Sequence, residues 1–81
     1  MATEQFDGLN ETDQKVLMAL LDLRSATLSR LSEATGCTER QLIPSLRELQ
    51  RREIVVGANS LLWLASRRAV HAWARRQKRI G

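Results

Sequence analysis

The chain has 81 residues, of which 43% are hydrophobic and 27% charged, with a single cysteine and a single histidine. This composition is typical of a globular protein, and the length predicts one domain with little room for a deep catalytic cleft. One cysteine excludes an internal disulfide and a cysteine-based zinc cluster. Four acidic side chains and no long apolar run occur in the first fifteen residues. We therefore expect neither a signal peptide nor a membrane segment, and a cytoplasmic location.

Charge is distributed unevenly along the chain. The formal net charge is +4, but residues 1–39 carry three basic and seven acidic side chains, whereas residues 40–81 carry ten and two. Eleven of the thirteen basic residues are arginine, whose planar guanidinium suits paired hydrogen bonds to phosphate. A polyanionic partner for the C-terminal half is one interpretation, and a solvated basic helix is the other.

The N-terminal part predicts a tail followed by a helix. Residues 1–8 are interpreted as a flexible N-terminal tail, so that a single domain covers residues 9–81. Asn10 is a good N-cap and Asp13 stands at the third helical position, where a carboxylate complements the helix dipole. Apolar residues then recur at helical spacing as far as Leu23. The following residues, 25–28, predict a turn or a very short strand.

Two further helices are predicted in close succession. Ser29 is expected to cap a short helix over residues 30–35, with Leu31 and Ala34 on its buried face. Gly36 ends that helix, because glycine adopts positive φ without steric cost.

The third helix is predicted over residues 38–51. Thr38 and Gln41 have the spacing of a capping box at its start. Its buried face is marked by Leu42, Leu46 and Leu49.

After the third helix the pattern changes from helical to extended. Residues 54–57 and 61–65 predict two strands of a β-hairpin, with residues 58–60 as the turn. Ser66 can cap a basic C-terminal helix over residues 66–80. The expected fold class is therefore mainly α with a small β-hairpin (α+β).

This order of elements resembles the winged helix-turn-helix domains of small bacterial and archaeal transcription regulators. The residues that carry the resemblance are Ser29, Ala34, Thr35, Gly36, Cys37 and Thr38, then Leu42, Leu46 and Leu49, and finally Ile54 and Val55. The resemblance implies three helices, a β wing and a C-terminal helix. It also implies a DNA-binding protein that regulates transcription, with residues 38–51 as the recognition helix and residues 54–65 as the wing.

The resemblance places duplex DNA against the exposed positions of residues 38–51. Arg40 is the best candidate for a base contact, because arginine can donate two hydrogen bonds to guanine. Phosphate contacts are expected from the other polar positions and from the C-terminal helix. The complete predicted DNA-binding set is Thr38, Arg40, Arg47, Arg51, Arg52, Arg67, Arg68, Arg75, Arg76, Lys78 and Arg79.

Several residues depart from the usual pattern of such DNA readers. Ile43 and Pro44 occupy positions that are commonly polar, and Glu39 has the wrong sign for phosphate. Pro44 inside a helix costs about 3 kcal/mol unless the helix kinks. The expected wing contains no lysine or arginine over residues 56–64.

Apolar residues at positions expected to be exposed predict a protein interface, either in a homodimer or with another protein. The predicted interface residues are Ile43, Pro44, Leu61, Trp63, Val70 and Trp73. The alternative function is accordingly a winged-helix protein–protein interaction module. It would use the apolar patch of Ile43, Pro44, Leu61 and Trp63 and have no sequence-specific role on DNA.

The remaining candidate chemistry is weak. Cys37 has no second cysteine, so a small apolar residue in a turn is favoured over a redox or metal sensor. His71 stands alone on a basic helix and is interpreted as a surface residue. No nucleophile–base pair, phosphate-binding glycine loop or carboxylate cluster is present in the sequence. We therefore expect no enzymatic activity, no cofactor and no metal.

Overall fold

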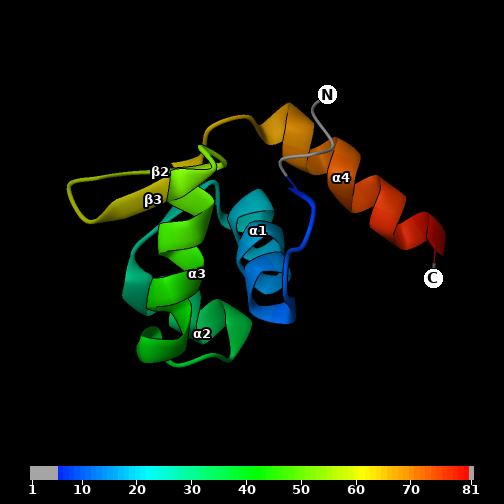
Figure 1. The fold of residues 1–81 in the computed structure, drawn as a ribbon. Helices are drawn as coiled ribbons and strands as arrows, with labels where there is room; N and C mark the ends of the chain where they lie inside the picture. Colours follow the sequence, from blue (N-terminus) through cyan, green and yellow to red (C-terminus); the bar gives the residue numbers. More distant parts are fainter. Residues whose placement is uncertain (1–5, 81) are drawn as a thin grey trace.

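The computed structural model describes residues 6–80, with side chains as far as Arg76. Four helices pack beside a three-stranded antiparallel sheet of order β1-β3-β2, whose β2–β3 hairpin projects from the body of the molecule (Figure 1). The elements are α1 (Glu11–Leu23), β1 (Ser25–Ala26), α2 (Leu28–Thr35), α3 (Glu39–Arg51), β2 (Val55–Ala58), β3 (Leu61–Leu64) and α4 (Arg67–Ile80). The prediction of a mainly α fold with a small β-hairpin is confirmed at this level.

Capping side chains set the helix starts. At α1, the Asn10 side chain accepts a hydrogen bond from the Asp13 amide at 2.8 Å, and the Asp13 carboxylate accepts from the Asn10 amide. Thr38 and Gln41 form the same reciprocal pair at α3. The predicted Asn10 cap of α1 and the predicted capping box of α3 are confirmed, and the reciprocal pair makes the start of α1 a capping box as well. Each box satisfies two amides that would otherwise lack a partner.

The second helix ends at Thr35 with Gly36 as its cap, as predicted, but its start and one residue of its buried face differ from the prediction. Thr27, rather than Ser29, accepts from the Arg30 amide, so α2 begins at Leu28. Leu31 is buried as expected, but Ala34 is exposed. Threonine and serine are both good caps, and sequence alone did not separate them.

The hairpin closes through a two-residue turn at Asn59 and Ser60, whose φ values are both positive, 52° and 68°. Two consecutive positive φ values match the right-handed twist of the strands that they join. The prediction for residues 25–28 left open a turn or a very short strand. Residues 25 and 26 form a strand, β1, in which Ser25 pairs with Trp63 of β3. The hairpin is thereby tied to the segment that follows α1.

A single core joins the helices to the inner face of the sheet. Its fully buried members come from every helix and from β2, and the largest are Leu17, Leu20, Leu31, Leu42, Leu49, Val16, Val55 and Val70. α3 packs on α1 and continues through Pro44 without a break. No helix among residues 6–80 has the length and apolarity needed to cross a bilayer.

The predicted N-terminal tail is wrong for its last residues. Phe6 is only 7% exposed and stacks on Trp73 of α4, with ring centroids 5.8 Å apart. Residues 6–8 therefore belong to the folded domain, because an aromatic ring supplies enough apolar area to dock the segment. Residues 1–5 of the predicted tail lie outside the described residues.

Candidate nucleic-acid interface

The third helix buries one side and presents the opposite side to solvent. Its buried residues are Leu42, Ser45, Leu46 and Leu49. With 3.6 residues per turn, Arg40, Arg47 and Arg51 fall in line on the opposite side, and all three are exposed. We call these three residues the arginine stripe. Thr38 stands at the start of the same helix, where its hydroxyl accepts from the Gln41 amide.

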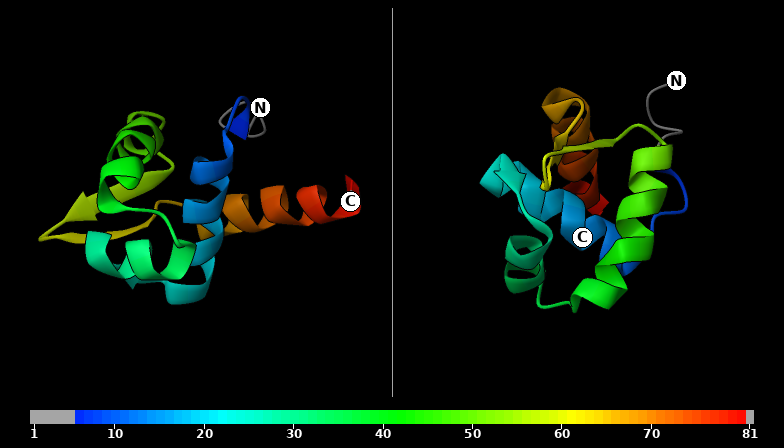
Figure 2. Two further views of the ribbon diagram at one scale, coloured as in Figure 1. Left: turned by 90° about the horizontal axis from the view of Figure 1, so that it is seen from below. Right: turned by 90° about the vertical axis from the view of Figure 1, so that its left-hand side faces the viewer.

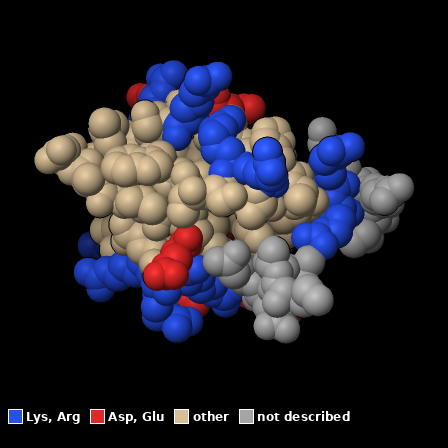
Figure 3. Space-filling view, turned by 90° about the horizontal axis from the view of Figure 1, so that it is seen from above, with Lys and Arg blue, Asp and Glu red and all other residues tan. Residues whose placement is uncertain are grey.

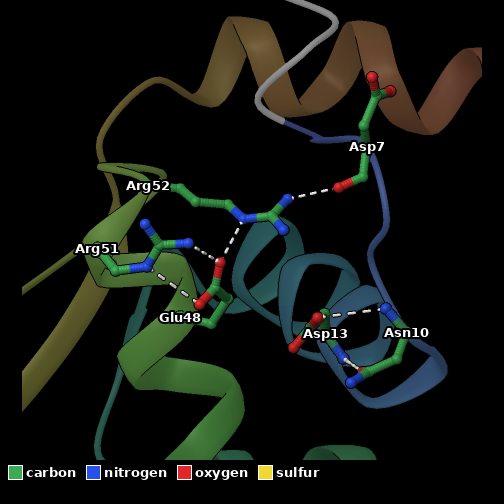
Figure 4. Close-up of polar contacts among 6 residues, drawn as sticks. All are labelled: Asp7, Asn10, Asp13, Glu48, Arg51 and Arg52. Carbon is green, nitrogen blue, oxygen red and sulfur yellow. Dashed lines mark hydrogen bonds and ion pairs between the residues drawn. The ribbon is translucent and has the colours of Figure 1, made fainter.

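A carboxylate at the end of α3 holds two of the predicted phosphate-binding arginines. Glu48 accepts from Arg51 Nη2 at 2.6 Å and from Arg52 Nε at 2.7 Å (Figure 4). The Arg52 guanidinium also donates to the backbone carbonyl of Asp7 at 2.6 Å. The Arg52 side chain is thus only 24% exposed and ties α3 to the N-terminal segment, whereas that of Arg51 remains 73% exposed. Arg51 stays accessible to a ligand, and Arg52 serves the fold.

This cluster predicts a pH-dependent contribution to stability. Hydrogen bonds from Arg51 and Arg52 lower the pKa of Glu48 from its ordinary 4.5 to about 2. Because the pKa is lower in the folded state, ionised Glu48 stabilises the fold above about pH 4.5, and this stabilisation is lost as the pH falls towards 2. The Tm of the wild type should exceed that of Glu48→Gln near neutral pH, and the difference should vanish near pH 2.

The matched control for that comparison is Glu33→Gln. Glu33 is well exposed and lies 3.8 Å from Arg30 in a looser ion pair. The Tm of Glu33→Gln should differ less from that of the wild type across the same pH range. A Glu48→Gln difference that stays constant from neutral pH to pH 2 would contradict the assigned role of the carboxylate.

Arg67 is occupied by the fold as well. Its guanidinium donates to the carbonyl oxygens of Leu20 and Leu21, at 3.2 and 2.6 Å. These carbonyls belong to the last turn of α1, which contains no basic residue of its own. A cation that hydrogen-bonds these oxygens stabilises the helix end and joins α4 to α1. Sequence reasoning assigned Arg67 to phosphate, because nothing local reveals a contact across more than forty residues.

Arg67→Ala is expected to lower the free energy of unfolding by about 1.5 kcal/mol, since hydrogen bonds from a charged donor are lost. The neighbouring Arg68 is exposed, so Arg68→Ala is the control and should change stability by less than about 0.5 kcal/mol. Urea denaturation followed by circular dichroism measures both. Equal stabilities for the two variants would show that the Arg67 contact contributes nothing.

The exposed arginines of α4 that were predicted to bind DNA lie apart from the arginine stripe. Arg68, Arg75 and Arg76 are exposed on α4. Figure 2 shows that α1 lies between α4 and the end of the molecule formed by α3 and the hairpin. Lysine and arginine accordingly form separate groups with uncharged surface between them (Figure 3). Two further predicted contacts, Lys78 and Arg79, have side chains outside the described residues.

The predicted apolar interface divides into buried and accessible members. Val70 and Trp73 are 1% and 5% exposed. They are wrong as interface residues, because the core of the same chain already covers them. Ile43 and Leu61 are 41% and 40% exposed, Pro44 is also exposed, and Trp63 is half-buried.

A groove that the sequence did not predict runs along α3. It is about 670 Å³ in volume and lies between the beginning of α2, α3 and the hairpin. Glu39, Ile43, Arg47 and Gln50 line it from α3, and residues 57–62 line it from the hairpin. A Cβ at Gly57 would lie 2.8 Å from Gln50 Nε2, so glycine there leaves room for the Gln50 side chain against the strand. The spacing of Ile43, Arg47 and Gln50 on one side of α3 was the signal available in the sequence.

The structure gives little support for a metal site or for a chemical role of Cys37 or His71. No group of three or more His, Cys, Asp or Glu side chains among the described residues could hold a metal ion. Cys37 is half-buried in the turn before α3, and His71 is exposed on α4. No protein-family model matches the chain, and no curated protein matches it in sequence. The surface of α3 and the groove beside it remain the strongest candidate site among the described residues.

Proposed function

We propose that the chain is a winged helix-turn-helix domain that binds duplex DNA through the exposed face of α3 and regulates transcription. The order of helices and strands and the sheet order β1-β3-β2 support this assignment of the fold. In that arrangement α2 and α3 form the helix-turn-helix, with Gly36 in the left-handed conformation between them, and β2 and β3 form the wing.

The arginine stripe is the observation that carries the proposal. Arg40 and Arg51 are eleven residues apart on α3, so their Cα atoms are separated by about 16 Å along the helix axis. The major groove is about 12 Å wide and admits an α-helix, which allows one end of the stripe to reach base edges. Arg40, in the first turn, is placed for a base contact. Arg47 and Arg51 are placed for phosphates on the groove walls.

The exposed arginines of α4 act as a second electrostatic surface in this proposal. Arg68, Arg75 and Arg76 have no acidic residue after Glu53 to neutralise them. They attract DNA at long range and add non-specific affinity. In a homodimer the two copies of α3 would enter successive major grooves about 34 Å apart.

A fluorescence-anisotropy titration with a labelled random duplex tests this function. We expect a sub-micromolar Kd at about 50 mM salt and a steep loss of affinity by about 200 mM, because bound arginines release counterions from phosphates. Absence of measurable binding at the lower salt concentration would overturn the proposal.

A second candidate function is supported by the outer face of the hairpin. The cross-strand pairs Val56–Trp63 and Ala58–Leu61 lie on the face opposite buried Val55 and Leu64. An accessible apolar sheet face of this kind favours association with a protein, including a second copy of the chain. Sedimentation velocity tests self-association: the wild type should be a dimer and Leu61→Glu a folded monomer. A monomeric wild type would remove the homodimer from the account.

A further inference from the structure

Ile43 is an exposed apolar side chain between two arginines of α3, beside the apolar lining of the groove. It is 41% exposed on α3, three residues after Arg40 and four before Arg47. The core contacts of α3 are made by Leu42, Leu46 and Leu49, so the fold does not require a β-branched apolar residue at position 43. Its side chain forms part of the wall of the groove between α3 and the hairpin.

The two arginines that flank Ile43 favour DNA over an apolar protein surface as its partner. Burying Ile43 against a protein would also remove the guanidinium groups of Arg40 and Arg47 from water, which costs free energy unless each finds an acceptor. A major groove supplies those acceptors at the same time, as guanine N7 and O6 and as phosphate oxygens. Glu39 lines the same groove of the protein and is suited to accept from the amino group of cytosine.

We propose that Ile43 is a specificity-determining residue that contacts the 5-methyl group of a thymine in the major groove. The methyl group is the one apolar feature of the major-groove base edges, and apolar side chains recognise it by contact. Arg40, to which the proposed function assigns the base contact, reads a guanine beside that thymine. The preferred ligand is therefore duplex DNA with thymine next to guanine. This inference rests on the proposed DNA-binding function.

The test removes the methyl group without changing any hydrogen bond of the base pair. Preferred sites are first selected from a random duplex library with the full-length wild-type chain. Each thymine of the selected site is then replaced singly by deoxyuridine, and Kd is measured by anisotropy. One replacement should weaken wild-type binding about fourfold, which corresponds to about one buried methyl group.

Variants at position 43 assign the effect to this side chain. Ile43→Ala should bind the thymine and uracil duplexes equally, whereas Ile43→Val should retain most of the difference. The matched control is Met18→Ala, which shortens a similarly exposed apolar residue of α1, 42% exposed, and should keep the fourfold ratio. The Tm of each variant reports that it is folded.

The possible results separate the inference from the proposed function. Binding without sequence selection, or uniform affinity for every uracil-substituted duplex, would overturn the role of Ile43 and leave DNA binding intact. The role of Ile43 would also be overturned if Ile43→Ala kept the fourfold ratio of Kd between the uracil and thymine duplexes. Absence of binding to any duplex at about 50 mM salt would overturn both.

Discussion

Replacing Arg47 by alanine is expected to weaken binding to duplex DNA about tenfold, with no loss of folding stability. Arg47 lies in the middle of the arginine stripe and is exposed, and no ion pair with an acidic side chain holds it within the described residues. Its guanidinium is therefore available to phosphate or guanine without breaking an existing contact. Losing one phosphate contact should also reduce the slope of log K against log salt by about one.

The matched control for Arg47 is Lys15 on α1. Lys15→Ala removes the same formal charge, but Lys15 pairs with Glu11 at 3.3 Å and lies on a helix outside the proposed interface. Its effect on Kd should be less than about twofold, as expected for the loss of long-range attraction alone. Anisotropy at several salt concentrations measures both variants. Equal effects of the two substitutions would mean that DNA responds to net charge and that α3 holds no defined interface.

Phe6→Ala is expected to lower the free energy of unfolding by about 3 kcal/mol, a large share of the stability of so small a domain. The ring is almost fully buried and stacks on Trp73. Its removal opens a cavity between the N-terminal segment and α4, and it weakens the contact that holds residues 6–8 on the body. Urea denaturation at equilibrium measures the loss.

Two controls make this prediction specific. Phe6→Leu keeps most of the buried volume and should cost less than half as much. Met18→Ala truncates an exposed apolar side chain and should cost less than about 0.5 kcal/mol. If Phe6→Ala is as stable as the wild type, the stacking contact contributes nothing and the N-terminal segment behaves as the tail that its composition indicates.

Local chemistry explains which parts of the fold were predictable. The caps at Asn10 and Thr38 depend on residues three positions apart, and the turn at Gly36 depends on one residue that adopts positive φ at no cost. The exposed face of α3 follows from helical periodicity alone. The sequence alone therefore predicts that Arg40, Arg47 and Arg51 share one surface.

Contacts between distant segments could not be predicted in this way. In the sequence, Phe6 is a single apolar residue in a polar stretch. Only the folded structure shows that Trp73 of α4 lies beside it. Arg52 and Arg67 resemble the neighbouring surface arginines, yet backbone carbonyls of Asp7, Leu20 and Leu21 accept their hydrogen bonds. These intramolecular roles of Arg52 and Arg67 could not be predicted, because a backbone carbonyl that lacks a partner leaves no mark in the sequence.

We propose above all that duplex DNA binds to the exposed face of α3. The most direct test of this binding is a titration of the isotopically labelled chain with a short duplex, followed by backbone amide chemical shifts. The largest shift changes should fall within residues 38–51 and on residues 57–62 of the hairpin, which face the same groove. Shift changes confined to α4, or no changes at about 50 mM salt, would contradict the account.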